Sequence, residues 1–386
     1  MKLPVVVAAL GTAQTLAWGS SYYLPAILAD PIAQGLALSR TTIFGLFSAA
    51  LLLSAVLGPS VGRAIDNHGG RGVLTLSNLV LAAGLVLLGT AQGFVTVAVA
   101  WAVLGVGMAM GLYDPAFATL TGLYGRAARG PITGITLIAG FVSTVGWPLS
   151  AFLDAQFGWR WACFISALHI LIGLPLNRLL IPRAPPPARA PEMAAESLRA
   201  PRGAMVILAF VFAATWFVTG AMAAHLPRLL EIAGASTTAA IAAAALVGPA
   251  QVAARLVEFG ALRRVHPLVS ARLAALLHPV GAVILGLFGP AAITAFAVLH
   301  GAGNGLLTIA KGTVPLVIFG PAGYGLRSGI LGAPARATQA FSPLLFDLLM
   351  DRMGIGVIAV SAGLSLTAFA AMLLLKARPR AAPVPA

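Results

Sequence analysis

The chain has 386 residues, of which 59% are hydrophobic and only 9% carry a charge. A soluble globular protein has roughly 25% charged residues, so this composition excludes a water-soluble fold and indicates a surface that faces lipid. The formal net charge of +14 would point to nucleic acid in a soluble chain, but the positions of the basic residues give it another meaning. The one cysteine, Cys163, excludes an internal disulfide framework and a cysteine-based metal site.

Long runs without charged residues predict membrane-spanning helices, because a span needs about 20 apolar residues. Turn residues divide the two longest runs, at Gln92-Gly93 and at Gly289-Pro290. The predicted spans are 4–28, 41–62, 73–91, 94–123, 131–153, 159–181, 204–227, 237–262, 268–289, 291–318, 326–348 and 353–376. The sequence therefore predicts an all-α membrane protein with twelve transmembrane helices.

The segment 182–203 differs from the rest of the chain, because prolines alternate in it with charged residues. This pattern is typical of a solvated linker. It divides the chain into an N-terminal six-helix bundle, residues 1–181, and a C-terminal six-helix bundle, residues 204–386.

The distribution of Lys and Arg predicts how the chain is oriented. If the N-terminus is cytoplasmic, seventeen basic residues fall on the cytoplasmic side, and only Arg40, Arg160, Arg228 and Arg352 fall on the other. Cytoplasmic loops carry the excess of basic residues, so both termini are expected in the cytoplasm. The positive charge then needs no nucleic-acid partner. The strong preference for Arg over Lys, with abundant Ala and Gly, suggests a bacterial chain and hence the inner (plasma) membrane.

The two halves share an internal repeat. The corresponding positions, first half before second, are Gly58-Pro59 and Gly248-Pro249, Arg63 and Arg255, Asp66 and Glu258, and Gly105-x-Gly107 and Gly301-x-Gly303. Repeated six-helix halves predict pseudo-symmetric bundles with a substrate site between them near the middle of the membrane.

Two motifs reveal a resemblance that covers the whole chain. They are Gly62-x-x-x-Asp66-x-x-Gly69-x-Arg71 between helices two and three, and Gly158-Trp159-Arg160 at the start of helix six. With them the sequence resembles the major facilitator superfamily of secondary transporters. The resemblance implies that Asp66 meets the N-terminal end of helix eleven and latches a cytoplasmic gate. That gate would comprise Gly62, Arg63, Asp66, Gly69 and Arg71. A carboxylate at a helix N-terminus gains up to about 2 kcal/mol. The alternative interpretation of Asp66 and the two arginines is that they are ordinary charged residues of a cytoplasmic loop.

Within the superfamily, the chain looks most like the monocarboxylate and related organic-anion porters. The residues that carry this likeness are Tyr113-Asp114-Pro115 in the glycine-rich helix four, Arg255 in helix eight and His225 near the outer end of helix seven. The resemblance implies a monomeric carrier that moves a small organic anion by alternating access.

We single out five ionisable residues inside the predicted spans: Asp114, Arg255, Glu258, Lys311 and Arg336. Each would cost at least about 2.5 kcal/mol at the centre of the bilayer unless it faces water or an opposite charge. They are therefore the main functional candidates. Arg255 or Arg336 is predicted to bind an anionic group of the substrate, because a guanidinium can do so with two hydrogen bonds.

Asp114 is the first candidate for proton coupling, since a partly buried acid can titrate near neutrality, and Glu258 is the second. Lys311 is expected to pair with Asp114 when the cytoplasmic side closes, which makes it part of the gate. Two alternatives remain open: Asp114 pairs permanently with Arg336 or Lys311 and only holds the halves together, or Arg255 and Glu258 form a static pair. Side chains suited to the wall of the cavity are Trp18, Tyr22, Tyr23, Tyr113 and Asn304. The likeness to the organic-anion porters implies that His225 also belongs to the substrate site.

These observations predict a proton-coupled symporter of a small, monocarboxylate-like organic anion that lies in the lipid bilayer. The alternative is proton-coupled efflux of drugs, metabolites or toxic ions in the same fold. Exporters of this superfamily commonly carry Gly-Pro-x-x-Gly-Gly in helix five, and the segment 140–146 lacks that pattern, which favours uptake. We find no nucleophile–base pair, metal motif or phosphate loop, so neither an enzyme, nor a cofactor, nor a metal is expected.

Overall fold

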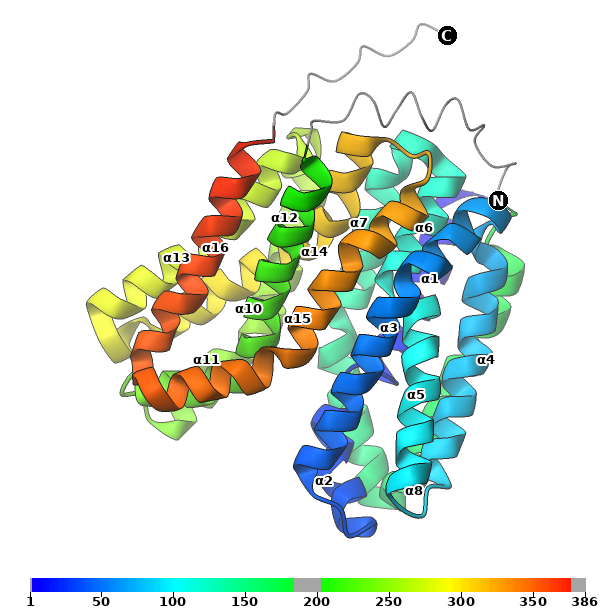
Figure 1. Cartoon of the computed structure of the whole chain (residues 1–386), viewed down its shortest axis with the longest axis horizontal. Helices are drawn as coiled ribbons and strands as arrows, with labels where there is room; N and C mark the ends of the chain where they lie inside the picture. Colours follow the sequence, from blue (N-terminus) through cyan, green and yellow to red (C-terminus); the bar gives the residue numbers. More distant parts are fainter. Residues whose placement is uncertain (1, 184–202, 376–386) are drawn as a thin grey trace, which may run out of the picture.

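The computed structural model describes residues 2–183 and 203–375, and this part of the chain is helical without strands (Figure 1). The first half contains α1 Leu3–Gly19, α2 Pro25–Gly35, α3 Arg40–His68, α4 Gly70–Gly89, α5 Phe94–Gly111, α6 Tyr113–Tyr124, α7 Arg129–Ile138 and α8 Val142–Leu180. The second contains α10 Ala204–Ile232, α11 Thr237–Ala245, α12 Val247–Gly260, α13 Pro267–Phe288, α14 Ile293–Phe319, α15 Tyr324–Met353 and α16 Val357–Leu373. Most of the predicted linker, residues 184–202, and the last residues, 376–386, lie outside the described residues.

All twelve predicted spans fall on these helices, so the all-α membrane fold is confirmed. Seven continuous helical stretches within the described residues are long and apolar enough to cross a membrane, and some run through several predicted spans. One reason is that α8 contains both the end of the fifth predicted span and the whole sixth, joined at Gly158. The φ angle of Gly158 is 78°, a left-handed conformation that glycine adopts without strain.

Four predicted spans are not single helices. The span 131–153 consists of α7 and the start of α8 with a 3-10 turn between them, and the span 237–262 consists of α11 and α12, which meet at Leu246. The span 4–28 consists of α1 and α2, with a turn from Ser20 to Leu24 between them, and it continues to Gly35. The span 94–123 is interrupted at Leu112, whose backbone is extended. Our prediction of an unbroken helix was therefore wrong in these four places.

The break at Leu112 follows from the proline that comes after it. Pro115 has no N–H group, so the carbonyl oxygen of Gly111 loses the partner that an uninterrupted helix would supply. The side-chain amide of Gln14 on α1 donates to that carbonyl at 2.7 Å instead. The Gly111 carbonyl thus keeps a partner at the break, and the break places Asp114 in the first turn of α6.

The sequence repeat has a counterpart in the packing. A side-chain carbon on Gly105 of α5 would collide with the backbone of Ala50 on α3, and one on Gly301 of α14 would collide with the backbone of Val247 on α12. Glycine is therefore needed at the same contact in both halves, where two helices approach closely.

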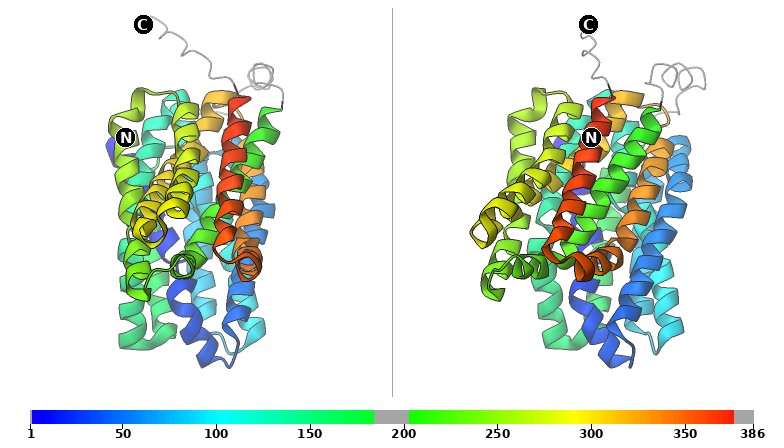
Figure 2. Two further views of the ribbon diagram at one scale, coloured as in Figure 1. Left: turned by 90° about the vertical axis from the view of Figure 1, so that its left-hand side faces the viewer. Right: turned by 60° about the vertical axis from the view of Figure 1, so that its left-hand side comes forward.

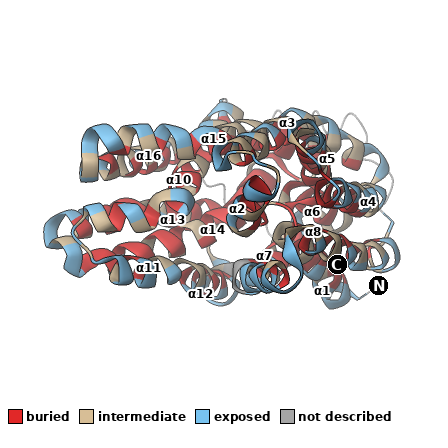
Figure 3. Ribbon diagram, turned by 90° about the horizontal axis from the view of Figure 1, so that it is seen from below, coloured by how far each residue is buried: buried red, intermediate tan, exposed pale blue. Residues whose placement is uncertain are grey.

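The two halves meet along α3 and α15, which run side by side in Figure 1. The start of α1 and the end of α16 lie at the same end of the molecule in the views of Figure 2. Buried residues lie towards the centre of the ribbon in Figure 3, and exposed residues lie towards its outer edges. The outer surface carries large apolar side chains such as Val56, Trp161 and Leu287, as expected for contact with lipid.

Candidate functional site

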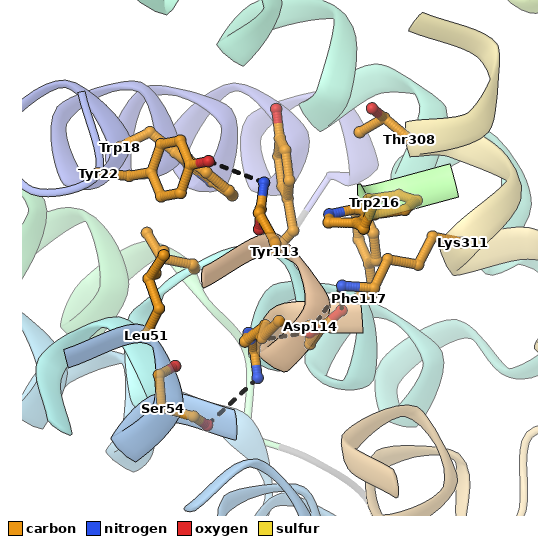
Figure 4. A pocket seen from close by; sticks show the side chains of 13 residues that line it. Trp18, Tyr22, Leu51, Ser54, Tyr113, Asp114, Phe117, Trp216, Thr308 and Lys311 are labelled. Atoms are coloured by element: carbon orange, nitrogen blue, oxygen red, sulfur yellow. Dashed lines mark hydrogen bonds and ion pairs between the residues drawn. The ribbon is translucent and has the colours of Figure 1, made fainter. Parts of the chain in front are cut away.

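A pocket lies between the two halves, with about 470 Å³ of empty space that includes open solvent (Figure 4). Helices α1, α3 and α6 line it from the first half, and α10, α14 and α15 from the second. The residues that line it are Trp18, Tyr22, Leu51, Ser54, Leu112, Tyr113, Asp114, Phe117, Trp216, Thr308, Lys311, Arg336 and Gln339. Residues at two helix breaks therefore line the pocket: Tyr22 between α1 and α2, and Leu112 between α5 and α6.

Three charged residues from different helices meet in the pocket. Asp114 lies 3.0 Å from the Nζ atom of Lys311 on α14, and its Oδ2 atom lies 2.5 Å from a terminal nitrogen of Arg336 on α15. All three residues are buried, with 5–7% of their surface exposed. Arg336 also donates to the backbone carbonyl of Ser54 at 3.4 Å, and the Nζ atom of Lys311 lies 4.9 Å from the ring centre of Trp216. These are the only charged residues among those that line the pocket, so its net charge is positive.

The pairing of Asp114 with both basic residues matches one of the open alternatives and also the expected contact of Lys311. Asp114 belongs to the first half, whereas Lys311 and Arg336 belong to the second. The contact therefore joins the two halves in this conformation. An ion pair between moving halves can break and reform during a transport cycle, so its presence is compatible with both a static and a functional role.

Tyr113 lies in the pocket wall, where its ring stacks on that of Phe117 at 5.3 Å and lies 4.9 Å from Trp18. Sequence reasoning missed Trp216, Gln339 and five other residues of the wall. Trp216 lies in the first helix of the second half, as Trp18 does in the first half, so the internal repeat held a signal for it.

Three residues that we predicted in the substrate site do not line this pocket. His225 is bonded to the carbonyl of Pro343 at 2.8 Å, towards the other end of α15. Asn304 accepts from Thr219 at 2.9 Å and lines a smaller cavity inside the second half. Arg255 donates to the carbonyl of Thr136 at 3.0 Å, on the side of the interface formed by α7 and α12.

At one end of the interface, Asp66 caps the start of α15. Its two carboxylate oxygens accept from the backbone N–H groups of Gly325 and Leu326, each at 2.8 Å. These are the second and third residues of α15, whose N–H groups have no partner within the helix. This is the contact that the resemblance implied for Asp66.

The helices approach closely at the same place, because a side-chain carbon on Gly62 would overlap the carbonyl group of Gly325. The other residues of the expected gate lie close by. Gly69 joins α3 to α4 with a φ angle of 78°. Arg63 is exposed near the end of α3, and Arg71 is half-buried at the start of α4. The turn thus holds Asp66 against the opposite half.

A second contact across the interface involves Glu258, the repeat counterpart of Asp66. Its Oε1 atom accepts from Arg129, the first residue of α7, at 2.8 Å. Arg129 also donates to the carbonyls of Leu262 and Val265, at 3.1 and 2.6 Å. Glu258 pairs here with Arg129, whereas one open alternative paired it with Arg255. Each half therefore directs one acid from its second helix to the start of the fifth helix of the other half.

Comparison with known proteins identifies this architecture. Residues 10–309 match the family model described as Major Facilitator Superfamily. The chain belongs to the major facilitator superfamily. It is therefore a multi-pass membrane transporter and not an enzyme, as the sequence predicted.

Several solved transporter structures have the same fold as this chain, although their sequence identity to it is low. The human organic anion transporter MFSD10 (TETRAN) is 18% identical, with a TM-score of 0.74 over 96% of this chain and 100% of that chain. The proton:xylose symporter XylE, bound to 6-bromo-6-deoxy-D-glucose, is 15% identical, with a TM-score of 0.75 over 96% and 95%. The E. coli fucose:proton symporter FucP is 14% identical, with a TM-score of 0.72 over 97% and 99%. At these identities the likeness establishes the fold alone.

The contact of Gly62 with α15 gives a first prediction for this transporter. We call the conformation in which Asp66 caps α15 the closed conformation. We expect Gly62→Ala to reduce its population by about tenfold or more. The added methyl group would overlap Gly325, and overpacking typically costs about 1–3 kcal/mol. Spin labels at the exposed positions Asn67 and Arg264, one in each half, would report the closed fraction as a distance distribution. Gly72→Ala is the matched control, since no atom lies within 4 Å of its added carbon. An unchanged distribution in Gly62→Ala would contradict the prediction.

The pairing of Arg129 with Glu258 gives a second prediction. We expect Arg129→Gln to destabilise the closed conformation by about 3–5 kcal/mol, because Glu258 is only 3% exposed and would keep a buried charge without its partner. The double variant Arg129→Gln, Glu258→Gln removes both charges and should recover much of that loss. The same spin-label distances measure the effect. Equal closed fractions in the single and double variants would show that the ion pair contributes nothing.

Proposed function

We propose that this transporter takes up a small organic anion together with a proton, by alternating access, in the inner membrane of a bacterium with both termini in the cytoplasm. The observation that carries the proposal is the position of Asp114 between Lys311 and Arg336, in a pocket lined by both halves. The pocket has one acid and two bases, so an anion has a place there that a neutral or cationic substrate does not.

Exchange of counter-ions couples the anion to the proton. The carboxylate of the substrate binds Arg336 and Lys311, the two groups that hold Asp114 in this conformation. Asp114 then loses its counter-charges while it stays buried, and a buried carboxylate without a partner is far less stable than the neutral acid. It therefore binds a proton as the substrate enters. One anion and one proton leave the total charge of the pocket unchanged, so the loaded halves can move without a new buried charge.

The contacts at the other end of the interface supply the gate. We assign the Asp66 cap of α15 and the Arg129–Glu258 pair to the cytoplasmic closure, which must break before the substrate is released inside. This use of Glu258 takes it away from proton coupling, because Arg129 already neutralises it. Arg255, which bonds to Thr136 close to the same pair of helices, belongs to this closure as well.

Proton-coupled efflux would use the same pocket with the opposite coupling. Asp114 would then bind its proton as the anion leaves, so that proton and anion move in opposite directions. The missing exporter pattern in the segment 140–146 is the observation that favours uptake.

The test is transport by the purified protein in liposomes. We expect lactate or pyruvate to accumulate when the outside is made acidic, together with alkalinisation of the outside, and accumulation to stop when an ionophore collapses the pH gradient. Protein-free liposomes correct for passive leak. If a panel of organic anions gives no protein-dependent flux with either direction of the pH gradient, the proposal is wrong. Anion flux that drives protons the opposite way would establish antiport and hence the efflux alternative.

A further inference from the structure

The wall of the pocket beyond its three charges is mainly aromatic. Five of the thirteen residues that line it carry aromatic rings: Trp18, Tyr22, Tyr113, Phe117 and Trp216. Only two, Leu51 and Leu112, carry an aliphatic side chain. A short aliphatic acid such as lactate would satisfy the charges and leave these rings without a partner.

The rings come from both halves and lie next to the charges. Trp18 and Tyr22 lie on the α1 side in Figure 4, Trp216 lies on the opposite side next to Lys311, and Tyr113 lies between them above Asp114. The ring centre of Trp18 is 5.1 Å from that of Tyr22, edge-on, and 4.9 Å from that of Tyr113, tilted. An anion held by Lys311 would thus place its remaining atoms among ring faces.

A polar atom in the same wall also has no partner. The indole Nε1 atom of Trp18 is buried, and within the described residues it has no hydrogen-bond partner. A buried donor that stays unpaired is costly, so a ligand oxygen near Trp18 would be favoured. The hydroxyl of Tyr22, by contrast, already accepts from Gln339 at 2.7 Å.

We propose that the preferred substrate is an aromatic carboxylate: an acid whose carboxylate binds Arg336 and Lys311 while a ring on the neighbouring carbon packs between Trp18 and Trp216. This inference rests on the proposed function and narrows the substrate class of the same site. It makes Trp216 a residue that determines specificity, since its ring contacts both the bound acid and the Lys311 side chain that holds the carboxylate.

Three acids of matched acidity test the ring. Lactate has a methyl group where mandelate has a phenyl ring, and hexahydromandelate has a saturated six-membered ring of similar size in its place. We expect mandelate to bind to the purified transporter about tenfold or more tightly than lactate, from ring contacts and buried area, and measurably more tightly than hexahydromandelate. Isothermal titration calorimetry gives each affinity directly, without interference from passive leak.

Variants connect the preference to the pocket. We expect Trp216→Leu to lower the ratio of mandelate to lactate affinity by about threefold or more, and Trp18→Phe to lower it less, because a ring remains. Trp161→Leu is the control, because that side chain is 60% exposed on the outer surface. Equal affinities for the three acids, with proton-driven lactate uptake intact, would overturn the aromatic preference and leave the proposed function standing. If no acid binds and none is transported, the proposed function itself fails.

Discussion

Replacing Asp114 by asparagine is expected to abolish proton-driven accumulation of the substrate while it spares exchange of substrate for substrate. The amide cannot bind the proton that Asp114 takes up when it leaves Lys311 and Arg336, so the pH gradient loses its connection to the anion. Exchange needs only the two bases, which remain. Accumulation should fall to the level of the imposed anion gradient, and counterflow in liposomes preloaded with the same anion should persist.

The Asp114→Asn variant also separates the functional interpretation from the static one. Without the carboxylate, two buried cations are left together, and removing one partner of a buried ion pair costs about 3–5 kcal/mol. A bound anion replaces the missing charge in our mechanism, so the substrate should raise the melting temperature of this variant more than that of the wild type. If Asp114 only joins the halves, the substrate gives no such rescue. Accumulation at the wild-type level would remove Asp114 from the coupling role.

Arg336→Gln is expected to weaken substrate binding by about a hundredfold. A charge-assisted hydrogen bond to a carboxylate contributes about 1.5–3 kcal/mol, and the variant loses both this bond and the net positive charge of the pocket. Arg336→Lys keeps the charge but not the planar pair of donors, so it should recover only part of the affinity. Calorimetric titration with the best-binding carboxylate measures all three proteins.

Arg255→Gln is the comparison for that variant, because the sequence alone offered Arg255 and Arg336 as equal candidates. Arg255 does not line the pocket and bonds to Thr136 across the interface. We expect Arg255→Gln to leave the affinity for the anion within about twofold and to change the closed fraction instead. A loss as large as that of Arg336→Gln would return Arg255 to the substrate site.

Local rules were enough for much of this fold. Runs of apolar residues gave the spans, and the rarity of charges inside them drew attention to Asp114, Lys311 and Arg336, which the structure brings together. A buried charge has few ways to be stabilised, so a chain with so few of them limits the possible pairs. The contact of Asp66 with the start of α15 was implied by the resemblance.

Other features depend on distances that no local rule contains. The partner of Glu258 is Arg129, which lies 129 residues away, and a sequence pattern cannot state how two distant helices are rotated against each other. The position of Arg255 outside the pocket has the same origin. The break between α1 and α2 was missed because its residues, Ser20 to Leu24, are uncharged and continue the apolar run.

The side-chain amide of Gln14 has a mechanical consequence for the cycle. It is bonded to the Gly111 carbonyl, which lies directly before the break that begins α6, so a hydrogen bond connects α1 to that break. The same α1 carries Trp18 in the wall of the pocket. A bulky substrate that displaces α1 would therefore also displace the break before α6, and with it the carboxylate of Asp114, three residues after Gly111. In this way α1 would link the size of the substrate to the release of Asp114 from Lys311 and Arg336.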